Sequence, residues 1–214
     1  MMMMRKKDIK AFRPANHGWL QYQLNSQEMD YVWRCIKNKK EDYKHELAGN
    51  ISGSYGLQDR SDWFYRNTLK PLILQYSDEF INIGRSVAVN QTHPYYLEKW
   101  WVNYQQQTEF NPLHCHKGVY SFVIWMKIPF SFAQQNKKKI ASNSNTPRIS
   151  AFQFNYSNML GEMIEYVYKL NPTDEGSMLF FPSKLHHQVF PFYDCDEDRI
   201  SVSGNIVLNT TKLL

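Results

Sequence analysis

Residues 111–128 read NPLHCHKGVYSFVIWMKI, and this stretch decides which kind of fold the chain can form. Its second part, residues 119–128, is a near-continuous apolar and aromatic run that Pro129 closes. A short run rich in β-branched and aromatic side chains is typical of a buried strand. Its first part carries His114 and His116, so one stretch combines a core strand with side chains that can bind a metal.

Upstream of this stretch the pattern is helical. A helix is expected over residues 26–38, because apolar side chains recur from Met29 at the spacing of one buried helix face. Asn25 followed by Glu28 resembles a capping box at its start. A second helical segment is expected over residues 62–80, and the proline at position 71 should kink or split it.

Downstream the pattern is that of strands, separated by polar loops. The expected strands cover residues 96–104, 119–128, 149–156, 162–170, 177–181 and 199–208. Residues 1–20 are expected to be an irregular arm, and residues 39–60 and 131–148 to be loops. Helices first and strands after favour an α+β chain, mainly β, with helices packed outside one β-core rather than alternating βαβ units.

The composition is that of a globular chain. Its 214 residues, 43% of them hydrophobic, suit a single domain, with an N-terminal arm and helices over residues 1–95 and a β-core over residues 96–208. No apolar run is long enough for a membrane helix, and the charged start does not resemble a signal peptide. Three cysteines without CxxC spacing, Cys35, Cys115 and Cys195, favour a reducing cytoplasm over a disulfide framework.

The net charge of +5 raises the question of a nucleic-acid partner. The lysines and arginines are scattered, and the densest clusters, residues 5–7, 37–40 and 137–139, resemble a tail and loops. The sequence therefore argues against nucleic-acid binding, while a mildly positive pocket would suit a small anionic cosubstrate.

Two short stretches hold four of the seven histidines. Side chains two apart on a strand point to the same side, so His114 and His116 can face one metal ion if the segment is extended. A third ligand would come from His186 or His187, far downstream. Imidazoles suit iron, zinc, copper and nickel, although the same pair could also be a surface or core pair without metal.

Arg199 lies downstream of the second histidine pair and begins the last expected strand. Its planar guanidinium can pair bidentately with a carboxylate, and the Ser201 hydroxyl faces the same side. The alternative is an ion pair between Arg199 and one of the nearby carboxylates of Asp194, Asp196, Glu197 and Asp198.

Together, the pattern His114-x-His116, then Phe-Pro-Ser-x-x-x-His187, then Arg199-x-Ser201 resembles the 2-oxoglutarate/Fe(II) oxygenase superfamily, in its prolyl-hydroxylase-like branch. Residues 111–125 and the Phe-Phe-Pro-Ser motif are most similar to oxygenases of that superfamily encoded by bacteria and by tailed phages of marine cyanobacteria. The resemblance covers about residues 96–208, and the N-terminal helices match only in general style.

The resemblance implies a double-stranded β-helix, or jelly-roll, core of the cupin type with supporting helices. It implies Fe(II) held by His114, His116 and His187, the last chosen because it lies four residues after the serine of the motif. It implies 2-oxoglutarate as cosubstrate, its far carboxylate bound by Arg199 and Ser201. Tyr104 resembles a tyrosine that touches the same carboxylate, although a core aromatic is an equal alternative. O₂ and an unidentified primary substrate complete the reaction, a C–H hydroxylation in the cytoplasm, which would be that of an infected host if the chain is from a phage.

The chain departs from this family pattern at one position. Most members have Asp or Glu where this chain has His116, so a bound iron would keep one more positive charge. Two alternatives therefore stay open: a cupin-type dioxygenase with three histidines and no 2-oxoglutarate, and a non-catalytic jelly-roll binding or virion protein. Residues 131–148 are a candidate lid, with an inert surface loop as the alternative.

Overall fold

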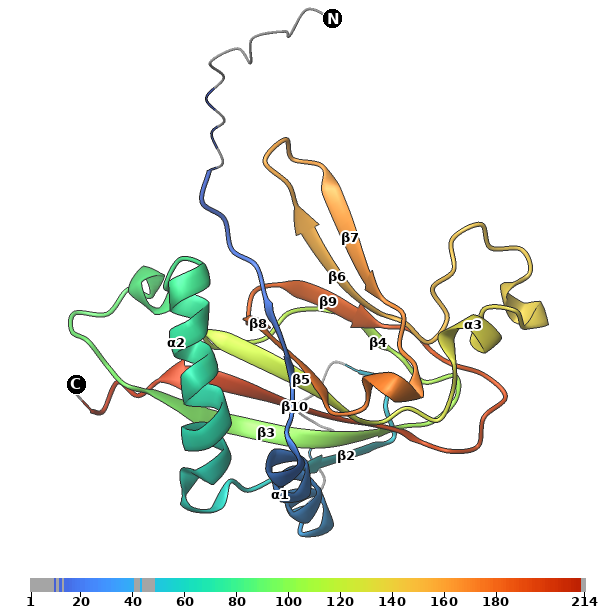
Figure 1. Cartoon of the computed structure of the whole chain (residues 1–214), viewed down its shortest axis with the longest axis horizontal. Helices are drawn as coiled ribbons and strands as arrows, with labels where there is room; N and C mark the ends of the chain where they lie inside the picture. Colours follow the sequence, from blue (N-terminus) through green and yellow to red (C-terminus); the bar gives the residue numbers. More distant parts are fainter. Residues whose placement is uncertain (1–9, 11, 13, 41–42, 44–48, 213–214) are drawn as a thin grey trace, which may run out of the picture.

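Two antiparallel β-sheets form the body of the protein in the computed structural model, which describes residues 10, 12, 14–40, 43 and 49–212 (Figure 1). The larger sheet has the order β1 (Leu20–Gln23), β8 (Ser177–Pro182), β5 (Tyr120–Lys127), β10 (Arg199–Leu208), β3 (Tyr95–Gln105) and β2 (Gly53–Gly56). The smaller sheet has the order β4 (Asn111–His114), β9 (His186–Val189), β6 (Phe152–Ser157) and β7 (Met163–Tyr168). From β3 to β6, and again from β7 to β10, consecutive strands alternate between the sheets, as in the jelly-roll core that the resemblance implied.

Two apolar cores hold these layers together. The core between the sheets consists of aromatic and aliphatic side chains of β5, β6 and β8 and their flanking loops, including Trp125, Phe152, Phe154 and Phe181. The other core lies between the outer face of the larger sheet and the helices α1 (Ser26–Lys37) and α2 (Lys70–Glu79) (Figure 1). The helices thus support the sheet from outside, and the inner face of the sheet is left for the site.

The capping box expected at the start of α1 is confirmed. The Asn25 side chain accepts a hydrogen bond from the Glu28 amide at 3.0 Å, and the Glu28 carboxylate accepts one from the Asn25 amide at 2.9 Å. The Thr68 hydroxyl also donates to this carboxylate, at 2.7 Å. The cap that starts α1 therefore also binds it to the next helical segment.

The second helical segment is split, as its proline predicted. It consists of a 3₁₀ turn (Arg60–Asp62), a π-helical turn (Tyr65–Leu69) and then α2, whose first turn contains Pro71. Proline is tolerated there because the first helical N–H groups have no partner within the helix. The buried side chains of α2, Leu72, Ile73 and Tyr76, face the larger sheet.

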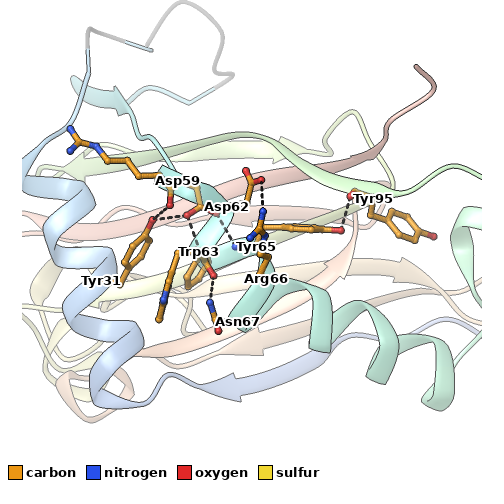
Figure 2. A network of polar contacts seen from close by, with 10 residues as sticks. Tyr31, Asp59, Asp62, Trp63, Tyr65, Arg66, Asn67 and Tyr95 are labelled. Atoms are coloured by element: carbon orange, nitrogen blue, oxygen red, sulfur yellow. Dashed lines mark hydrogen bonds and ion pairs between the residues drawn. The ribbon is translucent and has the colours of Figure 1, made fainter. Parts of the chain in front are cut away.

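A polar network around Asp59 fixes this segment to its neighbours (Figure 2). The Asp59 carboxylate accepts hydrogen bonds from the Tyr31 hydroxyl of α1 at 2.6 Å and from the Phe64 and Tyr65 amides at 2.9 and 2.8 Å. The Tyr65 hydroxyl in turn donates to the Tyr95 carbonyl at the start of β3, at 2.6 Å. Asp59 therefore links α1 to the π-helical turn, and Tyr65 links that turn to the start of β3.

Several predicted loops contain regular structure. The expected loop over residues 39–60 contains β2, which pairs with residues 101–104 of β3. The expected loop over residues 131–148 contains a short helix, α3 (Phe132–Gln135), and a 3₁₀ turn (Lys139–Ala141). The arm ends in β1, and most of its first residues lie outside the described part of the chain. Local polarity hid β1 and β2 because pairing with distant strands, not hydrophobic periodicity, creates them.

Two further expectations concern the cysteines and the possibility of a membrane-spanning helix. Cys35, Cys115 and Cys195 are all free thiols, which agrees with the expectation that the chain has no disulfide framework. Within the described ranges, none of the helices has both the length and the apolar character needed to cross a bilayer.

We predict that Gly118→Ala destabilises the fold more than Gly161→Ala. Both glycines have a positive φ, +117° and +83°. A Cβ on Gly118 would lie 2.9 Å from the Ile206 carbonyl oxygen, whereas a Cβ on Gly161 would meet nothing within 4 Å. The backbone strain alone costs about 1–2 kcal/mol, so Gly118→Ala should exceed that range in urea unfolding. Equal losses would show that the close contact has no energetic role.

Candidate active site

A cavity of about 410 Å³ lies between the two sheets. Its walls come from β3, β5 and β10 of the larger sheet and from β4, β6 and β9 of the smaller one. The polar lining side chains include three histidines, Arg199, and a row of short polar groups on β10, namely Ser201, Ser203 and Asn205. Inward-facing residues of a jelly roll normally fill the core, so an open, polar interior marks a binding site.

Three histidines converge on this cavity from distant parts of the chain. His114 at the end of β4 lies directly opposite His187 in β9. His116 is fixed by its backbone amide, which donates to the Ser183 carbonyl in the turn before β9 at 2.8 Å. One nitrogen of each ring lies within 4.8 Å of the other two, which makes His114, His116 and His187 a group that can hold a metal ion.

Backbone contacts orient two of these rings. The Nδ1 atom of His114 lies 2.7 Å from the Pro112 carbonyl oxygen, and that of His187 lies 2.9 Å from the Leu185 carbonyl oxygen. A carbonyl oxygen can only accept, so both Nδ1 atoms carry the proton. Each Nε2 atom therefore keeps its lone pair for another partner, which is the arrangement found in histidines that bind metals.

The rings are neutral at physiological pH. Burial lowers the pKa of His116 to about 4, and it lowers the pKa values of His114 and His187 as well. A charge on His114 would further lower the pKa of His116 and of His187, and a charge on His116 would further lower that of His187. A cluster of neutral imidazoles that excludes protons is ready to bind a cation, because a metal competes with protons for the same lone pair.

The spacing of one pair of these nitrogens fits a shared ion. The Nε2 atoms of His116 and His187 are 3.1 Å apart. Two adjacent ligands at right angles, each about 2.1 Å from an ion, lie about 3 Å apart. Three imidazoles on one side also leave further coordination positions for a substrate, as catalytic metal sites require.

The structure distinguishes the two consecutive histidines. His187 is only 4% exposed and faces the cavity, whereas His186 is exposed. Strand alternation in β9 explains the difference. The extended strand that would place both histidines on one face stops short of His116, because β4 ends at His114 and the next residues have no regular structure. Cys115, between the two histidines, is exposed.

Arg199 is the largest polar side chain that is fully buried, at 2% exposure. Its guanidinium donates to the Ser150 and Phe190 carbonyls at 2.8 and 3.1 Å, and to the Gln105 side-chain oxygen. The rings of Phe130 and Phe192 lie 5.5 and 5.8 Å from its central carbon. Burial lowers the pKa of Arg199 to about 9, which leaves it charged at neutral pH.

The alternative of an ion pair at Arg199 is wrong. The described residues include no carboxylate in ion-pair distance of its guanidinium. Glu197 instead pairs with Lys127 at 2.6 Å, and Asp194 pairs with Lys138 at 3.0 Å, both near the surface. A buried charge without an opposite charge is costly, so this cation points to an anionic ligand.

Of the other two residues predicted to bind the cosubstrate, the structure brings only one to the cavity. Ser201 lies two positions after Arg199 on β10, and both line the cavity. Tyr104 does not, because alternation along β3 turns it to the helix side, where it packs against Tyr55 and Lys39. The prediction for Tyr104 is therefore corrected to its alternative, a core aromatic.

Three residues of the site were not singled out from the sequence. Gln105 binds Arg199 from the neighbouring strand, and Ser183 holds His116. Ser150 has a left-handed backbone, with φ of +67°, and presents its carbonyl to Arg199. Only Ser183 had a signal in the sequence, the Phe-Pro-Ser motif, because side-chain partners across strands depend on register.

Aromatic side chains form the apolar part of the cavity wall. Trp101, Trp125 and Phe152 all line it. Trp101 stacks on Tyr43 with ring centroids 5.6 Å apart and lies 5.7 Å from the His116 ring. None of the residues 131–148, all of them described, lines the cavity, which favours a surface segment over a lid.

The sequence matches a family model described as "Putative 2OG-Fe(II) oxygenase" over residues 99–205, half of the chain. The chain belongs to this family of 2-oxoglutarate- and Fe(II)-dependent oxygenases. It is therefore an oxygenase that uses Fe(II) and 2-oxoglutarate, and the three-histidine cluster fits the binding of iron.

Solved structures are similar to this chain at low sequence identity. The α-ketoglutarate-dependent non-heme epimerase SnoN from nogalamycin biosynthesis is 12% identical, with a TM-score of 0.50 over 89% of this chain and 78% of that one. A Pseudomonas putida prolyl-4-hydroxylase is 14% identical, with a TM-score of 0.47 over 88% and 91%. HygX from Streptomyces hygroscopicus, solved with nickel, 2-oxoglutarate and hygromycin B, is 12% identical, with a TM-score of 0.47 over 91% and 84%. A search of curated protein sequences gives no match.

We predict that His187→Ala and His186→Ala differ sharply in metal binding. Loss of the buried ring removes one of three converging nitrogens, so the affinity for Co(II) should fall more than about tenfold. The exposed neighbour is the matched control, and its loss should change the affinity less than about twofold. Quenching of Trp101 fluorescence by the added ion, or equilibrium dialysis, measures both. Similar losses in the two variants would rule out the assignment.

Proposed function

We propose that His114, His116 and His187 bind Fe(II) through their Nε2 atoms. We further propose that Arg199 and Ser201 hold the far carboxylate of 2-oxoglutarate, and that the enzyme hydroxylates a C–H bond. The observation that carries the proposal is the presence, in one cavity, of converging imidazoles and a buried guanidinium without a counter-ion. A metal site and an anion site at one cavity are what this pair of cofactors requires.

When bound, Fe(II) and 2-oxoglutarate supply the oxidising chemistry, in which O₂ is consumed and the cosubstrate becomes succinate and CO₂. The protein's own residues supply geometry. The Nδ1 bonds of His114 and His187 to backbone carbonyls hold their rings in the orientation that turns each Nε2 inward. The aromatic wall formed by Trp101, Trp125 and Phe152 excludes water from the reacting groups.

The change from a carboxylate to His116 has an electrostatic consequence. Three neutral ligands do not reduce the charge of a divalent ion, and Arg199 adds another positive charge to the same cavity. Both charges attract a dianion such as 2-oxoglutarate. The change therefore supports binding of the cosubstrate, and it alters the electron donation to the metal.

We also propose that the chain works as one oxygenase domain, since α1 and α2 share a continuous apolar core with the larger sheet. Its three free cysteines are compatible with a cytoplasmic location. A phage origin rests on the resemblance of the sequence stretches around His114 and Ser183.

The primary substrate is a small molecule or a side chain that enters a cavity of about 410 Å³.

The decisive experiment is an anaerobic titration of the protein with Fe(II) and then 2-oxoglutarate. We expect a visible metal-to-ligand charge-transfer band that saturates with the cosubstrate. Arg199→Met should weaken its binding at least about tenfold, because the buried cation is lost. Lys127→Met is the matched control, since it removes a cation of the same sheet that does not line the cavity, and its effect should be small.

The other outcomes are equally informative. Iron binding without any effect of 2-oxoglutarate would contradict the proposal and favour a three-histidine dioxygenase that uses no cosubstrate. Absence of metal binding after reconstitution would favour a non-catalytic jelly-roll protein. If Arg199→Met and the parent protein bind 2-oxoglutarate equally well, Arg199 does not bind the cosubstrate. The rest of the proposal would stand.

A further inference from the structure

Gln105 and Arg199 form a buried cross-strand pair at one end of the cavity. They are direct partners in the register of β3 and β10, and both line the cavity. Gln105 is 3% exposed and Arg199 is 2% exposed. Side chains directly opposite each other on antiparallel strands are close enough to fix each other's orientation.

The orientation of the Gln105 amide is determined from both ends. Its Nε2 donates to the Glu109 carbonyl at 2.6 Å, so its Oε1 faces the guanidinium. That oxygen accepts from the Nε of Arg199 at 3.1 Å and also from Nη2. A reversed amide would place its N–H groups against the guanidinium donors and its oxygen against the Glu109 carbonyl oxygen, so the observed orientation is the stable one.

Among the described residues, all acceptors around Arg199 are neutral. Besides Gln105, they are the backbone carbonyls of Ser150 and Phe190. Arginine has five N–H donors, and the bonds to these three residues use four of them. The remaining donor lies on Nη1, and the positive charge as a whole is not compensated. Neutral acceptors therefore hold the guanidinium rigidly without neutralising it.

A glutamate at position 105 would have almost the same shape. Its carboxylate could accept the same two N–H groups in a bidentate ion pair, which is the stronger interaction. It would also remove the cost of an uncompensated buried charge. Gln105 therefore differs from a glutamate in one respect. It holds the guanidinium of Arg199 in the same geometry, but it leaves the attraction of that guanidinium for an anion intact.

We propose that Gln105 is the positioning residue for cosubstrate binding, and that its neutrality reserves the charge of Arg199 for the far carboxylate of 2-oxoglutarate. This inference rests on the role of Arg199 proposed above. It assigns no contact between Gln105 and the cosubstrate, because the amide acts through the guanidinium. It predicts that adding one negative charge at this position weakens cosubstrate binding without disturbing the metal site.

The test is Gln105→Glu, with Gln105→Met as a second variant that removes the acceptor and adds no charge. We expect the dissociation constant of 2-oxoglutarate, from the charge-transfer band in anaerobic Fe(II) protein, to rise at least about tenfold in Gln105→Glu. Gln105→Met should show a smaller rise, since orientation is lost but the charge remains. Affinity for Co(II) should stay within about twofold in both, because the histidines are untouched.

Asn103→Asp is the matched charge control. Asn103 lies two residues earlier on the same face of β3 and lines the same cavity, but its side-chain oxygen accepts from Ser54 at 2.7 Å and not from Arg199. A negative charge there should weaken 2-oxoglutarate binding less than the charge at position 105. The melting temperature of Gln105→Glu should equal or exceed that of the parent, since an ion pair replaces an amide contact.

Each contrary result has a distinct meaning. Unchanged 2-oxoglutarate affinity in Gln105→Glu overturns the inference, and so does a loss in Asn103→Asp as large as that in Gln105→Glu. If Gln105→Glu does not fold, as judged by circular dichroism, unchanged affinity in Gln105→Met overturns it instead. A parent protein without any cosubstrate band overturns the proposed function itself, so the two failures are distinguishable.

Discussion

The pairing of β4 with β9 is the contact on which the rest of the site depends. It places His114 directly opposite His187, and the turn before β9 holds His116 through the Ser183 carbonyl. Both strands have only four residues and lie in the smaller sheet, where β9 also pairs with β6. Without that register, two parts of the chain that are far apart in sequence would not share one ion-sized space.

Charge distinguishes this cavity from an ordinary core. Neutral imidazoles surround the space for the metal, and neutral oxygens surround the guanidinium of Arg199. Glu98 is the one carboxylate among the described lining residues. A buried cation without an anion is rare, because removing the cation from water costs roughly several kcal/mol. Only an opposite charge nearby offsets this cost. In the proposed function, a dianionic cosubstrate would supply that counter-charge.

The helices on the outer face of the larger sheet are held by buried polar contacts that do not involve the cavity. Glu28 and Asp59 each accept several hydrogen bonds, and together they connect α1, the π-helical turn and β3. These contacts lie on the outer face of the larger sheet, away from the cavity. The sheet is therefore held from one side by helices while its other side carries the polar row on β10, an arrangement that keeps the site on rigid elements.

The sequence by itself determined the mainly β character, the capped first helix, the split at Pro71 and the histidines and arginine that meet in the cavity. These follow from local periodicity and from motifs, which are properties of short segments. It did not determine β1 or β2, which exist only through pairing with distant strands, nor the short helical turns within residues 131–148. Nor did it separate Tyr104 from the site or connect Gln105 to Arg199. One position of register decides which face a strand residue occupies, and only the tertiary structure sets that register.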